Sequence, residues 1–124
     1  SSTVATLLPG TGYFLGKPQS QARKFLDQGV KVAFATDYNP GSCHCDNLLL
    51  LTSIAAANLE LNQTELWTAI TLNAGHALGL QDQGCLIKDL APRFSLFKAT
   101  NIDQITYNWG KNLAVNFSHF LPKR

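Results

Sequence analysis

Two short apolar runs separated by a helical pattern constrain the fold of this chain more than any other feature. The first run, Val4–Leu8, begins with a β-branched residue and is ended by Pro9. The second, Val30–Thr36, contains an unbroken apolar stretch, which is typical of a strand covered on both faces. Because short joints connect strand, helix and strand, we predict a βαβ unit with parallel strands and a right-handed crossover. No charge precedes Lys17, so this whole first segment is expected to lie inside.

Two helices are predicted, one between the strands and one after them. Residues 21–28 follow Ser20 as a capping residue and stop at Gly29, which supplies the left-handed conformation. Residues 47–59 carry no charge and follow Asp46, a second candidate cap. Because that second helix is apolar on nearly every side, it needs neighbours on nearly every side.

A third helix and a change of pattern follow. Asn62 and Glu65 have the form of a capping box, and the helix that they open is expected to run to about Ala74. Farther along, short β-type stretches at 94–97 and 113–120 are separated by polar turns. The chain is therefore predicted to have an α/β fold with a β-rich second part.

The composition is poor in charge for a free-standing domain. Charged residues make up 15% of the 124 residues, where about 25% is usual, and hydrophobic residues reach 45%. With so little polar surface, we expect either extensive association, as in a homo-oligomer, or excision from a larger protein. The chain opens at Ser1 and contains no methionine, which favours an excised piece.

Charge, hydropathy and cysteine content argue against several classes of partner. The net charge of +2 comes from scattered residues without a basic stripe, so we expect no nucleic acid partner. No apolar segment has the length of a membrane span, so we expect no membrane partner either. The three cysteines lack the spacing of a disulfide scaffold, which favours a reducing compartment such as the cytoplasm.

The densest polar cluster, residues 36–46, begins where the second predicted strand ends. In parallel α/β folds, ligands bind at the carboxyl ends of the strands. Asp37 would be the first residue past a buried strand, and a carboxylate there needs a cation or a proton partner. The alternative is that Asp37 opens an Asx turn that residues 39–41 complete.

The rest of this cluster offers polar groups and an apparent metal motif. Asn39 and Ser42 offer donors and acceptors to a small polar ligand, while Gly41 bares its amide. The Cys-His-Cys string at 43–45 is a poor zinc site, because adjacent ligands rarely close one tetrahedral shell and no second pair follows downstream. We therefore expect no structural zinc site there.

Four strings carry a resemblance to a known family. They are Val-Ala-Thr-Leu-Leu-Pro-Gly-Thr at 4–11, Ala-Thr-Asp-Tyr-Asn-Pro-Gly-Ser at 35–42, Asn-Ala-Gly-His-Ala-Leu-Gly-Leu at 73–80 and Tyr-Asn-Trp-Gly at 107–110. Together they resemble the C-terminal part of the imidazolonepropionases, a family of metal-dependent amidohydrolases. The resemblance implies that residues 1–81 are the C-terminal portion of a (β/α)8 barrel. Residues 82–124 would then be part of a small β-sandwich domain.

The resemblance also implies a reaction and a set of site residues. The family hydrolyses the cyclic amide of 4-imidazolone-5-propanoate to N-formimidoyl-L-glutamate in histidine degradation, with a zinc or iron ion that activates water. Asp37 matches a metal ligand that also accepts the proton of that water. Asn39, Gly41 and Ser42 match positions that bind substrate or product.

Other parts of the family pattern are missing or altered. The His-x-His metal pair, the third histidine and the substrate-binding arginine match no segment here, and a catalytic zinc typically needs three protein ligands. We therefore expect the isolated polypeptide to be inactive. Asp89, Pro92 and Arg93 replace a glycine, an alanine and an aspartate of the family, which affects the small β domain. Two alternatives stay open, another cyclic-amide amidohydrolase or deaminase, and a non-catalytic association module.

Overall fold

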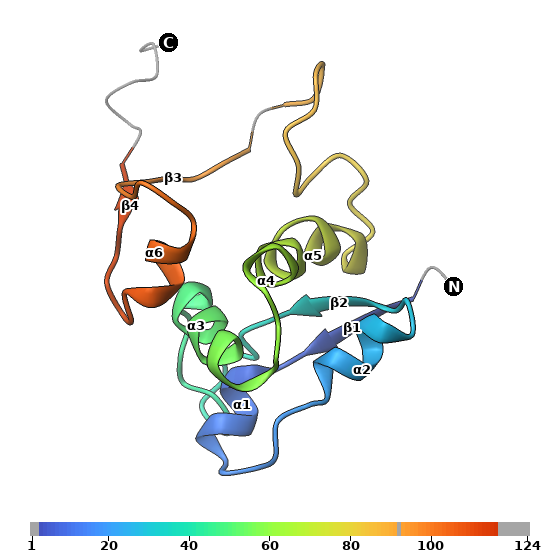
Figure 1. Cartoon of the computed structure of the whole chain (residues 1–124), viewed down its shortest axis with the longest axis vertical. Coiled ribbons are helices and arrows are strands. Elements are labelled where there is room, and N and C mark those ends of the chain that lie inside the picture. Colours follow the sequence, from blue (N-terminus) through green and yellow to red (C-terminus); the bar gives the residue numbers. More distant parts are fainter. Residues whose placement is uncertain (1–2, 92, 117–124) are drawn as a thin grey trace.

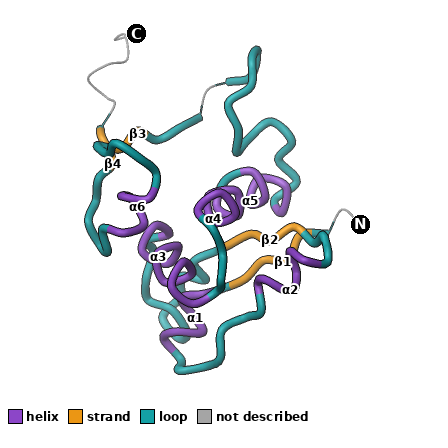
Figure 2. Tube along the Cα trace, in the orientation of Figure 1, coloured by secondary structure: helices purple, strands orange, loops and turns teal. Residues whose placement is uncertain are grey.

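The computed structural model describes residues 3–91 and 93–116, and mixes helices with short strands (Figures 1 and 2). The elements in chain order are β1 (Val4–Leu7), α1 (Pro9–Phe14), α2 (Ala22–Asp27), β2 (Lys31–Phe34), α3 (Leu48–Asn58), α4 (Gln63–Ile70), α5 (Leu72–Ala77), β3 (Leu96–Phe97), α6 (Asp103–Tyr107) and β4 (Ala114–Val115). This mixture of helices and strands confirms an α/β fold. No helix in the described ranges is long and apolar enough to cross a membrane.

The first half of the chain forms the predicted parallel unit. β1 and β2 pair in parallel over their full lengths, with Val4 opposite Lys31 and Leu7 opposite Phe34. The helix between them, α2, is followed by Gly29 with a φ of 73°, as predicted. Its N-terminal cap is Gln21, and no side chain caps it, so the capping role predicted for Ser20 was wrong.

The main core lies on one face of this small sheet. Because side chains alternate along a strand, Leu7, Val32 and Phe34 share that face. They are buried in one cluster with residues of α2, α3 and α4, namely Ala22, Ala55, Leu66 and Ala69, and with Leu59 after α3. On the opposite face Thr6 is exposed, although its partner Ala33 is buried. The predicted cover on both faces is confirmed for β2 itself, because Val32 and Phe34 on one face and Ala33 on the other are all buried, whereas β1 is exposed at Thr6.

The apolar helix α3 packs where helices from three parts of the chain meet. It contacts α1, α4 and α6, and residues 51–55 are buried. Its cap is Asn47, whose Oδ1 accepts a hydrogen bond from the Leu50 amide at 3.0 Å, and not Asp46 as predicted. Residues 48–50 are only half-buried, so the described residues leave part of the apolar surface of α3 exposed to solvent.

Helix α4 begins as predicted and is tied to α2. Asn62 and Glu65 form a capping box in which each side chain accepts from the other's backbone amide at 2.9 Å. The Glu65 carboxylate also accepts two hydrogen bonds from the Arg23 guanidinium, at 2.9 and 3.0 Å. These bonds from Arg23 lower the pKa of the Glu65 carboxyl below its ordinary value. The helix breaks at Thr71, short of the predicted end at Ala74, and α5 follows.

An asparagine on α5 covers the outer edge of β2. The Asn73 side chain is buried, and its Nδ2 donates a hydrogen bond to the Val32 carbonyl at 2.8 Å. A side chain thus satisfies a strand carbonyl that a further strand would otherwise bind.

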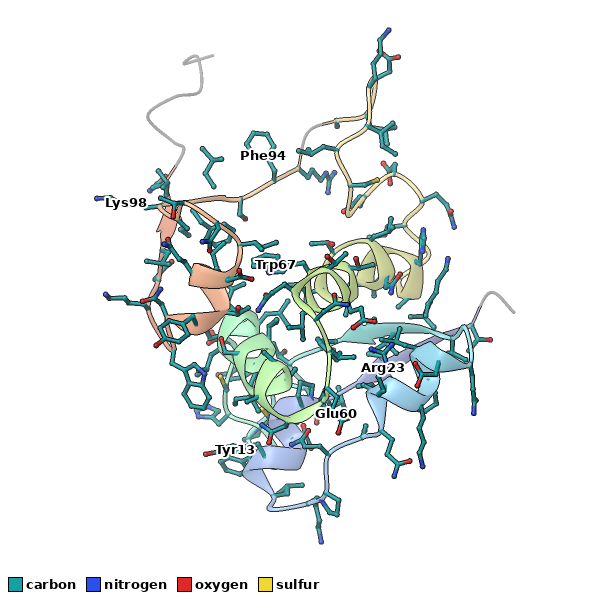
Figure 3. All side chains as sticks on the ribbon, in the orientation of Figure 1. Tyr13, Arg23, Glu60, Trp67, Phe94 and Lys98 are labelled. Atoms are coloured by element: carbon teal, nitrogen blue, oxygen red, sulfur yellow. The ribbon has the colours of Figure 1, made fainter. Side chains whose placement is uncertain are left out.

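Two short helices were not predicted. One is α1, which begins at Pro9 and leaves Tyr13, Phe14 and Leu15 exposed, so the expectation that this segment lies inside was wrong. Tyr13 points away from the body of the molecule (Figure 3). The other is α6, which packs against α3 beside the antiparallel pair β3–β4 (Figure 1). The strands of that pair are shorter than the predicted stretches at 94–97 and 113–120, and residues 117–120 lie outside the described residues.

Candidate functional site

The carboxyl ends of β1 and β2 bring two distant side chains together. Because the strands are parallel, the segments that leave them emerge at the same edge of the sheet. Thr11 lies on α1 just past β1, and Asp37 lies just past β2. The Thr11 hydroxyl donates a hydrogen bond to Oδ2 of Asp37 at 2.7 Å. Asp37 is half-buried at this edge, as expected from the parallel pattern.

Asp37 adopts a backbone conformation that few residue types accept. Its φ is 51°, in the left-handed region where aspartate and asparagine are the commonest non-glycine residues. This turn redirects the chain immediately after β2. The carboxylate can therefore face Thr11 while the loop continues to Asn39.

The Asn39 side chain organises the loop. Its Oδ1 accepts hydrogen bonds from the amides of Gly41 and Ser42, both at 2.8 Å. Its Nδ2 donates to the Asp37 carbonyl at 2.6 Å and to the Ser42 hydroxyl at 2.7 Å. These bonds use both amide protons and two lone pairs, which is the full capacity of the group. The Asx turn thus begins at Asn39, and the alternative that placed it at Asp37 was wrong.

Ser42 completes the arrangement around the Asp37 carboxylate. Its hydroxyl donates to Oδ2 of Asp37 at 3.1 Å while it accepts from Asn39. Oδ2 therefore receives two hydroxyl protons, from Thr11 and Ser42. Across residues 3–91 and 93–116, no group donates a hydrogen bond to the other oxygen, Oδ1. The structure brings all four predicted site residues together, with Gly41 exposed at the tip of the loop.

These residues could supply one ligand to a metal ion, but not a complete set of ligands. A carboxylate oxygen that accepts no hydrogen bond from the described residues, such as Oδ1 of Asp37, is a suitable donor to zinc or iron. Within the described part of the chain, no group of at least three histidine, cysteine, aspartate or glutamate side chains could hold an ion. A metal held by Asp37 would need further ligands from elsewhere.

The neighbouring Cys-His-Cys string separates in space. Cys43 is buried with Leu51 and Ile54, whereas the exposed His44 ring stacks on Tyr38 at a centroid distance of 5.3 Å. The Tyr38 hydroxyl also lies 3.3 Å from Nε2 of His44. Cys45 is half-buried and packs against the same cluster as Cys43, so the two cysteines share their surroundings while His44 lies apart from them.

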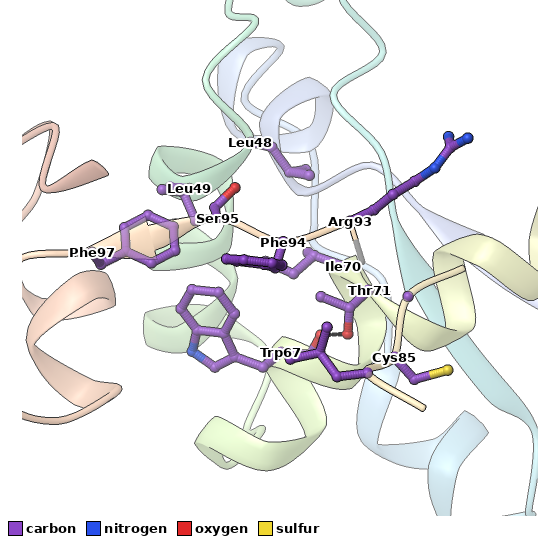
Figure 4. Close-up of a pocket in the computed structure, with 12 residues that line it drawn as sticks. Leu48, Leu49, Trp67, Ile70, Thr71, Cys85, Arg93, Phe94, Ser95 and Phe97 are labelled. Atoms are coloured by element: carbon purple, nitrogen blue, oxygen red, sulfur yellow. Dashed lines mark hydrogen bonds between the residues drawn. The ribbon is translucent and has the colours of Figure 1, made fainter. Parts of the chain in front are cut away.

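Away from the Asp37 loop, an apolar pocket lies between α3, α4 and the segment before β3. Its volume is about 810 Å³, and its lining is largely apolar, including Leu48, Leu49, Trp67, Ile70, Phe94 and Phe97 (Figure 4). The Trp67 and Phe97 rings meet edge to face at 6.0 Å, and the buried Nε1 of Trp67 has no hydrogen-bond partner among the described residues. Among the described residues that line it there is no carboxylate and no histidine, and its titratable side chains are Cys85 and Arg93.

Thr11 is the site residue that sequence reasoning missed. The available signal was its place just past the first predicted strand, at the same edge as Asp37. A hydroxyl is not by itself diagnostic, and only the parallel pairing with the observed register shows that the two residues meet.

Comparison with known proteins gives a consistent result. The imidazolonepropionase of Bacillus velezensis is 43% identical over 114 residues, which is 90% of this chain and 27% of that protein. The imidazolonepropionase of Staphylococcus saprophyticus is 44% identical over 115 residues, or 92% of this chain and 28% of that protein. This chain is homologous to part of imidazolonepropionase. The predicted resemblance to that family is thereby confirmed.

The extent of the match limits what it establishes. The imidazolonepropionase of Bacillus mycoides is 41% identical over 89% of this chain and only 26% of its own length. The chain therefore spans about a quarter of the length of the curated relatives that it matches. No family model matches the chain.

Proposed function

We propose that this chain supplies the C-terminal quarter of an imidazolonepropionase. Residues 1–81 would form the last portion of a (β/α)8 barrel, and residues 82–124 would form part of a small β domain. The parallel β1–β2 pair supports the first assignment, because its packed helices cover one face and its polar loop leaves the carboxyl edge. The antiparallel β3–β4 pair supports the second.

The proposed reaction is hydrolysis of the cyclic amide of 4-imidazolone-5-propanoate to N-formimidoyl-L-glutamate. A bound zinc or iron ion would lower the pKa of a water molecule and polarise the ring carbonyl. Oδ1 of Asp37 would be one ligand of that ion. The same carboxylate would accept the proton of the attacking water and pass it to the leaving nitrogen. The observation that carries the proposal is the half-buried Asp37 carboxylate, whose Oδ2 accepts two hydrogen bonds while Oδ1 accepts none from the described residues.

The loop would bind the polar groups of the substrate with its remaining capacity. The Asn39 amide is fully engaged inside the loop, so its part is to hold the neighbouring groups in place. The Ser42 hydroxyl keeps one lone pair, because it donates once and accepts once. That lone pair and the carbonyl of Gly41, an exposed residue, are acceptors, which suit the N–H groups of an imidazolone ring or a formimidoyl group.

The other parts of the proposal concern the assembly. Because a catalytic zinc typically takes three protein ligands, the 124 residues alone should be inactive and should need the remaining donors from further polypeptide. The half-buried leucines of α3 and the exposed side chains of α1 would be covered on assembly, and we expect a homo-oligomer. The substrate is a small metabolite, and we place its hydrolysis in the cytoplasm.

The substitution Asp37→Asn tests this function in the complete gene product, meaning the whole polypeptide encoded together with these residues. We expect the rate of 4-imidazolone-5-propanoate hydrolysis by the purified, zinc-loaded protein to fall about 10²–10⁴-fold, since a general base and a ligand are lost. Asp46→Asn is the matched control, because Asp46 is an exposed carboxylate of the same polar cluster. It should leave the rate unchanged.

Two results would contradict the proposal. One is an Asp37→Asn protein as active as the Asp46→Asn protein. The other is an unsubstituted protein that does not hydrolyse 4-imidazolone-5-propanoate but hydrolyses another cyclic amide or deaminates a ring compound. That result would favour the alternative of another cyclic-amide amidohydrolase or a deaminase. A complete gene product that acts on none of these compounds and that self-associates through α3 would favour the association module.

A further inference from the structure

Thr11 makes the shortest hydrogen bond that the Asp37 carboxylate receives. The Thr11 hydroxyl lies 2.7 Å from Oδ2, against 3.1 Å for the Ser42 hydroxyl. Hydrogen bonds to an ionised carboxylate are short and roughly twice as strong as neutral ones. The two donors come from different segments, because Thr11 belongs to α1 and Ser42 to the loop after β2. Thr11 therefore ties the Asp37 carboxylate to the end of the other strand.

The position of Thr11 is fixed by close packing of α1. Gly10, the residue before it, is buried against α3 and the loop. A Cβ on Gly10 would lie 2.7 Å from Cδ2 of Leu51 and 2.8 Å from Sγ of Cys43, closer than real Cβ atoms approach. The start of the helix is also held by Gln19, whose Nε2 donates to the Pro9 carbonyl at 3.1 Å. Because α1 can come this close, the Thr11 hydroxyl reaches Asp37.

The two oxygens of Asp37 consequently have different surroundings. Oδ2 accepts from two hydroxyls, whereas Oδ1 accepts no hydrogen bond from the described residues. A carboxylate without such fixed donors rotates, and either oxygen can then face a ligand. The hydrogen bonds from Thr11 and Ser42 to Oδ2 hold the carboxylate in one orientation and leave Oδ1 available to a ligand.

We propose that Thr11 is a positioning residue for Asp37, and that its hydroxyl occupies Oδ2 so that Oδ1 is the oxygen that binds the metal ion. This inference rests on the proposed function, in which Asp37 is a metal ligand. Partners that orient a metal ligand from outside the coordination shell typically change metal affinity or activity by 10- to 100-fold when they are removed.

Zinc affinity of the complete gene product tests this role independently of turnover. The metal-free protein is titrated with zinc against a competing chelator of known affinity. Thr11→Val replaces the hydroxyl with a methyl group of similar size, and we expect it to weaken zinc binding about 10- to 100-fold. Thr11→Ser keeps the hydroxyl and should bind zinc nearly as the unsubstituted protein does. Thr64→Val is the matched control, since Thr64 is exposed on α4, and should change nothing.

Thr11→Ala guards against a misfolded valine variant, because alanine removes the same hydroxyl without adding volume. A merely structural role for Thr11 would lower the melting temperature of the metal-free protein in all three variants without separating serine from valine and alanine in zinc affinity. That result, or equal zinc affinity in all variants, overturns the inference while the proposed function stands. An unsubstituted protein that neither binds zinc nor hydrolyses 4-imidazolone-5-propanoate overturns both.

Discussion

Gly10→Ala is the substitution that most directly tests the packing around the site. The added methyl group would meet Leu51 and Cys43 at less than 3.0 Å, and both of these side chains are buried with little room to move. Forcing one extra carbon into a packed core costs about 1–3 kcal/mol. Alanine in a helix gains back about 0.5–1 kcal/mol relative to glycine. Mid-range values give a net loss of about 1 kcal/mol in the free energy of unfolding.

Gly12→Ala is the matched control, because it makes the same chemical change within the same helix. Its Cβ would meet the end of the Gln19 side chain, at 3.0–3.3 Å, and a shift of that side chain would weaken its hydrogen bond to the Pro9 carbonyl, at a cost of about 0.5–1.5 kcal/mol. The helix propensity gain is common to both variants, so Gly10→Ala should be less stable than Gly12→Ala by about 1 kcal/mol, which is the packing cost of about 2 kcal/mol less the cost of that hydrogen bond. Urea unfolding of the complete gene product, followed by tryptophan fluorescence, measures that difference. Equal stability of the two alanine variants would refute the close packing of α1 against α3.

Two further predictions concern the polar groups that hold the fold. Asn73→Ala leaves the buried Val32 carbonyl without its donor and should cost about 1–3 kcal/mol, whereas Asn58→Ala at an exposed position of α3 should cost little; urea unfolding compares them. Since the Arg23 bonds lower the pKa of Glu65, the stability that they contribute is fully present above the ordinary value of 4.5 and is lost as the pH falls below it. Melting temperatures measured from pH 6 down to pH 3 should therefore fall less steeply for Glu65→Gln than for the unsubstituted protein, and parallel curves would contradict this.

Local patterns predicted those elements whose signals lie within a few residues. The parallel strands follow from two apolar runs and a short helix, and the α4 cap follows from Asn62 and Glu65. The cap of α3 was misplaced by one residue because Asp46 and Asn47 are both good capping residues, and only the backbone path selects Asn47. Helix α1 was missed because Pro9 and Gly10 usually end structure. Here Pro9 begins a helix whose contact with α3 compensates for its two glycines.

The candidate site was predictable in its loop and not in its partners. The string at 35–42 identified Asp37, Asn39, Gly41 and Ser42 through the family resemblance, and the strand pattern placed them at the carboxyl edge. The bond from Thr11 spans the whole βαβ unit, so it depends on register, which no local pattern fixes. The roles of the loop residues in binding substrate stay predictions.

The closed hydrogen-bond network of Asn39 has a consequence for recognition. Each backbone residue that must be ordered on binding costs about 1–2 kcal/mol in conformational entropy. Because Asn39 already fastens the amides of Gly41 and Ser42 and the carbonyl of Asp37, this ordering occurs when the chain folds. A ligand would therefore bind to a preorganised turn. Removing the hydrogen bonds of the Asn39 side chain would reduce affinity even for a compound that does not contact that side chain.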